Sequence, residues 1–125
     1  RRMMRVNEGE ENYISANDAA TLLCGIAQHT LASGEMCEVA ESYLLDQVDS
    51  EGLAQGLPAD IRFGHKTGSL ASVRHDGGIV YGENPYVVVM LTSLDETTAN
   101  ELMKEISSAV YEELDRDACP IPHSE

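Results

Sequence analysis

Positive charge is scarce in this sequence. Its 125 residues include 8 lysine and arginine residues against 22 aspartate and glutamate residues, which gives a formal net charge of −14. Binding to a nucleic-acid backbone or to an anionic membrane surface depends on lysine and arginine, so this balance argues against both kinds of partner. Apolar runs long enough to span a bilayer are also missing, and the first residues, Arg-Arg-Met-Met-Arg, do not have the apolar stretch of a signal peptide. The sequence leaves the localisation open.

Cysteine is sparse and irregularly spaced. Cys24, Cys37 and Cys119 are an odd number and form no Cys-x-x-Cys pair. They predict neither a disulfide framework nor a zinc site. We expect buried free thiols, with a bridge between Cys24 and Cys37 as the alternative, because both residues fall on predicted helices that can lie side by side. No metal and no cofactor is predicted.

The composition is typical of one folded domain. Hydrophobic residues make up 42% of the chain, enough for a core and too many for a disordered segment. The chain starts at Arg1 instead of a methionine, which predicts that it is a piece of something longer. Residues 1–14 are polar and charged, and they predict a loop or the end of an upstream helix.

The first half of the chain predicts a helical hairpin. Ser15 and Asp18 have the spacing of a capping box, and leucine and isoleucine recur at helical spacing behind them. Gly34 is expected to end this helix, and a second amphipathic pattern follows almost at once. The expected helices span residues 16–32 and 35–48.

The second half predicts three strands and a helix, which together with the hairpin make an α+β fold. Ile61 to His65 alternate in polarity, Ser69 to Arg74 form a polar connection of hairpin length, and a later apolar run without alternation is expected to be covered on both faces. Short turns make the strands an antiparallel meander, and the last helix has an apolar stripe that needs a sheet to lie on. The expected strands span residues 60–69, 77–82 and 86–93, the helix 97–115, and a tail 117–125.

The stretch Lys66-Thr67-Gly68-Ser69 carries the chemistry. It places an ammonium, a hydroxyl and a bare glycine in a row at the end of the first predicted strand. A lysine and a threonine can both bind a substrate anion, and a glycine lets a ligand approach the backbone. The Ser69 amide would then point at a developing oxyanion.

The whole pattern resembles the C-terminal part of the class A β-lactamase and penicillin-binding serine hydrolase family, from about Asn12 to Leu114. That family carries three signatures, Ser-x-x-Lys, Ser-Asp-Asn and Lys-Thr-Gly, and the third is present here. The stretches that match are Gly56-Leu57-Pro58, His65-Lys66-Thr67-Gly68-Ser69-Leu70, Asp76-Gly77-Gly78-Ile79-Val80, Tyr86 to Leu91, and the terminal helix with Ile106 and Val110.

The resemblance implies a role for each residue of the motif. Lys66 would set the electrostatics of the site, Thr67 and Gly68 would bind the substrate carboxylate, and the Ser69 amide would supply half of the oxyanion hole. Class A members often add an arginine beside the following strand, where this chain has glycine just before Ile79. The role would fall to Arg74 or to no residue.

Two of the three signatures are missing. The chain has two lysines, Lys66 and Lys104, and neither follows a serine by three residues. Ser15-Ala16-Asn17 fits a loose Ser-x-Asn pattern, but its position at a helix start predicts a cap. The nucleophile and the deacylating glutamate would lie upstream of Arg1, and the chain alone is predicted to be inactive.

Alternatives remain open at this stage. The parent protein is expected to hydrolyse a β-lactam through an acyl-enzyme, and the rivals are a D,D-peptidase acting on a peptidoglycan-like molecule or a non-catalytic domain of the same fold. His65 and the pair His75-Asp76 are expected to be a strand residue and a turn, instead of a general base or a metal pair. The family's sheet has further strands from the missing part, and without them one sheet edge would be bare. A bare edge predicts a homo-oligomer or a strand-exchanged dimer. Family habit suggests an extracytoplasmic parent.

Overall fold

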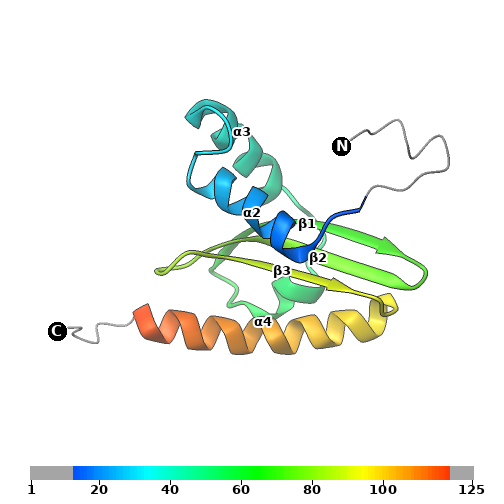
Figure 1. Ribbon diagram of the computed structural model, residues 1–125. Helices are drawn as coiled ribbons and strands as arrows, with labels where there is room; N and C mark the ends of the chain where they lie inside the picture. Colours follow the sequence, from blue (N-terminus) through cyan, green and yellow to red (C-terminus); the bar gives the residue numbers. More distant parts are fainter. Residues whose placement is uncertain (1–12, 119–125) are drawn as a thin grey trace, which may run out of the picture.

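The computed structural model describes residues 13–118, with side chains as far as residue 114. The predictions for residues 1–12 and for the tail after residue 118 lie outside the described residues. The elements are α2 (Ala16–Ala27), α3 (Gly34–Leu45), the 3-10 turn η1 (Gly52–Gly56), β1 (Arg62–Leu70), β2 (Val73–Tyr81), β3 (Tyr86–Thr92) and α4 (Glu96–Ala118) (Figure 1). The predicted α+β order, a helical hairpin, a meander and a terminal helix, is confirmed.

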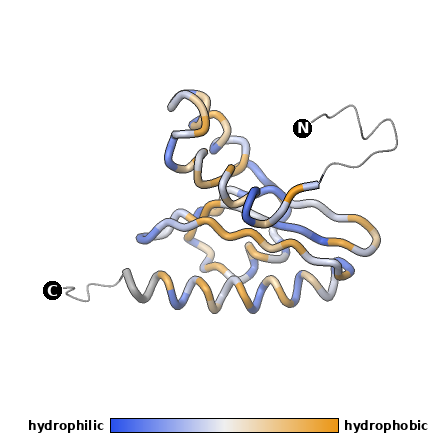
Figure 2. The backbone as a smooth tube through the Cα atoms, in the orientation of Figure 1, coloured by the Kyte–Doolittle hydropathy of each residue, from blue (hydrophilic) through white to orange (hydrophobic). Residues whose placement is uncertain are grey.

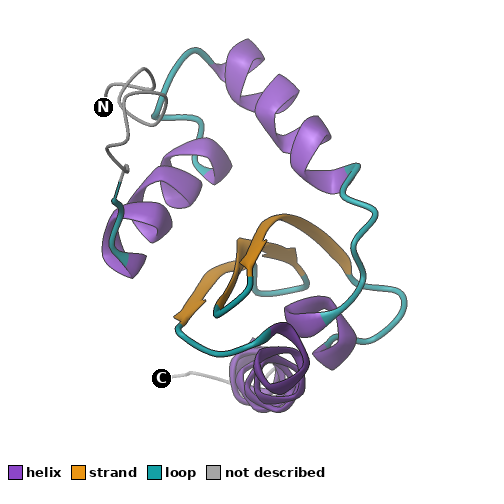
Figure 3. Cartoon of the chain, turned by 90° about the vertical axis from the view of Figure 1, so that its right-hand side faces the viewer, coloured by secondary structure: helices purple, strands orange, loops and turns teal. Residues whose placement is uncertain are grey.

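The sheet lies between two helical layers. Its strands are antiparallel in the order β1-β2-β3. The hairpin of α2 and α3 covers one face, and α4 with η1 covers the other; in Figure 3, α4 is seen end-on below the sheet. We call these the hairpin face and the α4 face. Because side chains alternate along a strand, neighbouring residues of β1 and β2 point to opposite layers.

The core is small and centred on β2. Leu53, Ile79, Val80, Ala99 and Met103 are at most 1% exposed. In Figure 2 the backbone tube is hydrophobic along most of β3, whereas hydrophobic and hydrophilic positions alternate along α4. η1 packs so closely on α4 that a Cβ at Gly56 would overlap the carbonyl oxygen of Lys104.

Both hairpin helices start at a serine cap, and both end earlier than predicted. Ser15 Oγ accepts a hydrogen bond from the Asp18 amide at 3.0 Å, which confirms the predicted cap. α2 ends at Ala27, five residues before the predicted end at 32, because His29 takes a left-handed backbone conformation with φ 57°. Gly34 does not end α2; it is the first residue of α3, which stops at Leu45 instead of 48.

The turn between the first two strands is shorter than predicted. β1 continues to Leu70, Ala71 and Ser72 form the turn, and β2 starts at Val73, so the expected polar connection from Ser69 to Arg74 belongs mostly to strands. His75 and Asp76 therefore lie within β2, and the prediction of a turn for them was wrong.

The last strand and helix also differ from the prediction in detail. The residues of β3 are half-buried except Leu91, which is exposed, so the expectation of full cover on both faces was wrong. β3 is an edge of the described sheet, which explains this exposure. α4 reaches Ala118, three residues beyond its predicted end. No helix among the described residues is both long and apolar enough to cross a bilayer.

Candidate functional site

The Lys-Thr-Gly stretch lies on the outer strand of the sheet. β1 pairs with β2 on one side, and no described strand pairs with its other side. Lys66, Gly68 and Ser69 are exposed and Thr67 is half-buried. A Cβ at Gly68 would meet no heavy atom within 4 Å, so a ligand can reach the backbone at this point.

The pairing register of β1 and β2, which form a β-hairpin, fixes the direction of the Ser69 amide. Leu70 and Val73 flank the two-residue turn and pair with each other, and Ser69 pairs with Arg74. In a hairpin of this kind the pair next to the turn exchanges backbone hydrogen bonds, and successive pairs alternate. The Ser69 amide therefore belongs to the set that points away from β2, as an oxyanion-binding donor requires.

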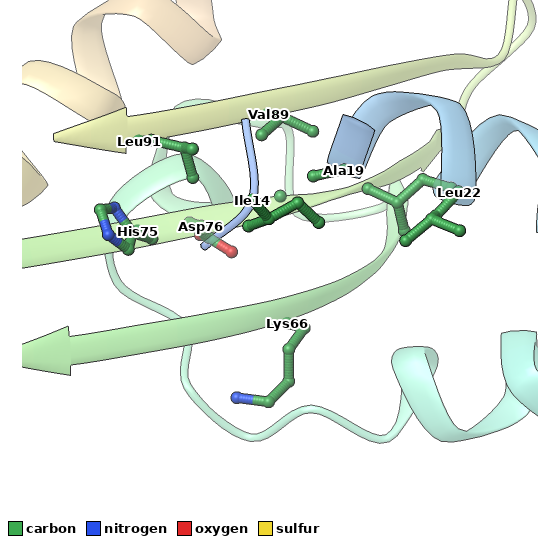
Figure 4. Close-up of a pocket in the computed structure, with 10 residues that line it drawn as sticks. Ile14, Ala19, Leu22, Lys66, His75, Asp76, Val89 and Leu91 are labelled. Carbon is green, nitrogen blue, oxygen red and sulfur yellow. The ribbon is translucent and has the colours of Figure 1, made fainter. Parts of the chain in front are cut away.

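The Lys66 ammonium lies on the same outer side. Its Nζ donates a hydrogen bond to the carbonyl oxygen of Thr67. In the close-up of Figure 4 the ammonium points away from Ile14, Val89 and Leu91. The positive charge of Lys66 and the outward amide of Ser69 are thus on one edge, and the two residues are three positions apart along the strand.

The Ser69 side chain has a different partner from its amide. Its Oγ donates to Glu96 Oε1, at 3.3 Å, at the start of α4. The hydroxyl thus points to the α4 face, and the amide alone points to the outer edge. The prediction that Ser69 matters through its backbone is compatible with this geometry.

Arg74 does not lie at the exposed edge. It is 1% exposed on the α4 face, where Nε donates to Asn100 Oδ1 at 2.9 Å and an Nη atom donates to Asp49 Oδ2 at 3.1 Å. A guanidinium held in this way cannot reach a ligand at the outer edge of β1, so the predicted substrate contact of Arg74 does not fit the structure.

The Asp49 carboxylate is perturbed by its contact with Arg74. Partial burial raises its pKa, but hydrogen bonds from the Glu51 amide and from the guanidinium outweigh burial and hold the pKa of Asp49 below its ordinary value. The carboxylate therefore stays ionised and balances the buried cation.

Sequence reasoning missed a second buried pair beside the motif. His65 Nδ1 lies 2.8 Å from Asp76 Oδ1, and the two residues are 4% and 1% exposed. Both point to the α4 face. The sequence holds a signal for this pair, because His65 precedes the motif and Asp76 follows it in the next strand. The pair was missed because a turn was predicted at Asp76.

His75 is separate from that pair. It points to the hairpin face, and its Nδ1 accepts a hydrogen bond from the Thr92 amide at 3.1 Å. Within residues 13–114, no group of three or more histidine, cysteine, aspartate or glutamate side chains is placed to hold a metal ion. Of the two free cysteines described, Cys37 is buried, as predicted, whereas Cys24 is exposed, so the prediction of a buried thiol was wrong for Cys24.

An apolar cavity of about 230 Å³ lies between α2 and the hairpin face of the sheet. Its walls are mostly aliphatic, and Lys66, His75 and Asp76 are the polar residues that also line it (Figure 4). Because its aliphatic walls offer few polar partners, this cavity does not by itself recognise an anion.

A third polar cluster joins α3 to the far end of the sheet. The Tyr81 hydroxyl donates to Glu41 Oε2 at 2.5 Å, and His29 Nε2 lies 2.7 Å from Glu41 Oε1. Burial and the hydrogen bond to Glu41 raise the pKa of Tyr81 well above its ordinary value. Burial raises the pKa of Glu41, but the two hydrogen bonds outweigh it and the pKa is lowered.

Comparison with known proteins places this fold in context. A family model described as the β-lactamase enzyme family matches residues 1–114. A search of curated proteins gave no match.

Several solved structures are similar. PBP-A is 27% identical, with a TM-score of 0.76, over 82% of this chain and 40% of its own. A β-lactamase from Sphaerobacter thermophilus is 24% identical, with a TM-score of 0.78, over 87% of this chain and 43% of its own. A halotolerant bacterial β-lactamase is 24% identical, with a TM-score of 0.71, over 92% of this chain and 49% of its own. The chain thus spans less than half the length of each.

Proposed function

Since the chain belongs to the β-lactamase enzyme family, we propose that the outer edge of β1 forms the carboxylate-binding and oxyanion-binding side of a serine hydrolase site that acts on β-lactams. The observation that carries the proposal is the edge itself. It presents the Lys66 ammonium, an open backbone at Gly68 and an outward amide at Ser69 on one side of the sheet.

Each group has a stated part in the reaction. The Lys66 ammonium attracts the substrate carboxylate, and the Thr67 hydroxyl donates a hydrogen bond to it. A serine hydroxyl gives up its proton as its oxygen attacks the lactam carbonyl, the carbonyl oxygen becomes an oxyanion, and the Ser69 amide donates to it. The carbonyl–nitrogen bond then breaks, the nitrogen takes up a proton, and water later releases the acyl group from the serine.

The serine is proposed to lie outside these 125 residues. No Ser-x-x-Lys occurs in the sequence. The chain covers 40% of the length of PBP-A, so a parent protein of similar size has room for the missing signatures. The 125 residues alone are therefore expected to be inactive.

A D,D-peptidase parent is the second candidate. The observation that favours it is the similarity to PBP-A, which is 27% identical over 82% of this chain. One structure of a PBP-A variant is an acyl-enzyme complex with penicillin G. The two candidates share the acylation step and differ in how fast water removes the acyl group.

Intact mass spectrometry with excess benzylpenicillin tests the proposal. This chain is expected to keep its mass, and a longer protein that adds the sequence upstream of Arg1 is expected to gain one penicillin. An adduct that persists for hours favours the peptidase, whereas one that clears as free penicilloate appears favours the β-lactamase. An adduct on the 125 residues, or none on the longer protein, would contradict the proposal.

A further inference from the structure

The buried pair of His65 and Asp76 lies directly under the motif. His65 precedes Lys66 on β1, and Asp76 is the register partner of Thr67 on β2. The 2.8 Å contact between Nδ1 and Oδ1 therefore joins the two strands at the positions of the motif, on the α4 face. The residues are at most 4% exposed, so neither can touch a ligand at the outer edge.

The pair is tightly enclosed. The His65 ring stacks on Phe63, with 4.3 Å between ring centroids. Gly78 pairs with His65 across the two strands, and a Cβ at Gly78 would lie 2.5 Å from the His65 Cβ. Arg74 is two residues from Asp76 on the same face of β2, and its described hydrogen bonds go to Asp49 and Asn100. Asp76 Oδ2 is buried with no hydrogen-bond partner among the described residues. Among the described residues, His65 is thus the one hydrogen-bond partner of the Asp76 carboxylate.

An edge strand needs such a constraint more than a central strand does. β1 has backbone partners on the β2 side alone, within the part of the chain that is described. Open edges are where local unfolding begins, because few contacts hold them. A small shift of β1 would move the Lys66 ammonium and the Ser69 amide together, and binding groups lose their effect when they are misplaced by about 1 Å.

We propose that His65 and Asp76 form a buried brace that positions the Lys66–Ser69 edge against β2. The brace acts through the strand and makes no contact with a substrate. Its value for catalysis rests on the proposed function, but the brace itself can be measured on this chain. A pair that serves stability alone would lower the protection of all core amides equally, and a brace would lower it locally.

Hydrogen exchange by NMR on the 125-residue chain separates these two roles. The Lys66 and Gly68 amides face β2 by the strand alternation, and the Val88 amide reports from β3. In Asp76→Ala, the first two are expected to lose at least about tenfold more protection than Val88. Asp76→Asn keeps an acceptor for the histidine and is expected to restore protection to within about threefold of the starting protein. Equal loss at all three amides, or no rescue by asparagine, would overturn the proposal.

Two further variants keep the test decisive. Tyr81→Phe removes a hydrogen bond at the other end of β2, and it is expected to leave Lys66 and Gly68 no more affected than Val88. If Asp76→Ala does not fold, Asp76→Leu is used instead, because leucine fills the same space with apolar atoms. The expected and the contradicting results are the same as for Asp76→Ala.

The catalytic consequence is tested on the longer protein. Asp76→Ala is expected to lower kcat/KM for benzylpenicillin by about tenfold or more, and Asp76→Asn by less than about threefold. A local loss of protection in this chain with no catalytic role for Lys66 in the longer protein would leave the brace standing and refute the proposed function. Uniform loss of protection would refute the brace whatever the activity.

Discussion

Gly78 is the residue whose replacement should most disturb the seating of β1 on β2. A Cβ at this position would overlap the carbonyl oxygen of Gly64 and would lie 2.5 Å from Cβ and 2.8 Å from Cα of His65. These atoms belong to backbone or lie next to it, so Gly78→Ala cannot be accommodated by turning a flexible side chain. β1 must move away from β2 at the level of the motif.

The size of the effect follows from two opposing contributions. Overpacking a rigid site costs about 1–3 kcal/mol, and contacts with backbone place this site near 3 kcal/mol. Alanine gains about 0.5–1 kcal/mol over glycine because it loses less conformational entropy on folding. Gly78→Ala is therefore expected to destabilise the chain by about 2 kcal/mol.

Gly68→Ala is the matched control on the opposite strand. A Cβ at Gly68 meets nothing within 4 Å, so only the entropic gain remains and the variant is expected to be about 0.5 kcal/mol more stable. Urea unfolding followed by circular dichroism measures both. With a slope of about 2 kcal/mol per M, the two midpoints should differ by roughly 1.2 M. Midpoints within about 0.3 M of each other would refute the close packing of Gly78 on β1.

Four other expectations follow. Because the pKa of Tyr81 is raised, its hydrogen bond contributes fully to stability below about pH 10 and less as the pH rises further. Tyr81→Phe should therefore lose less stability with rising alkaline pH in urea titrations. An unchanged dependence of stability on pH would contradict this. Because the pKa of Asp49 is lowered, its carboxylate stabilises the fold above about pH 4, and this contribution is lost as the pH falls. The stability of Asp49→Asn should therefore be less acid-sensitive between about pH 5 and 2, and equal sensitivity of the two proteins would contradict this. In the native chain a maleimide should label Cys24 well before Cys37, as peptide mapping would show; equal rates would contradict the difference in burial. Light scattering should report an oligomer, and a compact monomer would refute that prediction.

Local signals in the sequence predicted much of the hairpin and the sheet. The Ser15 cap, the alternation around Phe63 and the apolar stripe of the last helix all correspond to elements of the structure. Each of these signals depends on residues close together in the chain. The early end of α2 has no such signal, because His29 adopts a positive φ without a glycine or proline beside it.

The buried polar network could not be predicted in the same way. Arg74 and Asp76 are polar, and polarity in a short stretch predicts a loop. They are instead buried within a strand because their partners come from Asp49, Asn100 and His65, which are 25, 26 and 11 residues away in sequence. Only the fold brings such partners together, so local patterns could not predict that Arg74 is buried while Lys66 and Ser69 are exposed.

The most direct test of the account compares the two lysines of the chain in the longer protein. Lys66 lies on the exposed edge of β1, and Lys104 is exposed on the outer side of α4, so both can be replaced by alanine without opening the core. Lys66→Ala is expected to lower kcat/KM for benzylpenicillin by on the order of 10²- to 10³-fold, and Lys104→Ala by less than about twofold. Equal and small effects of the two substitutions would contradict the assignment of the β1 edge as the substrate-binding side of the site.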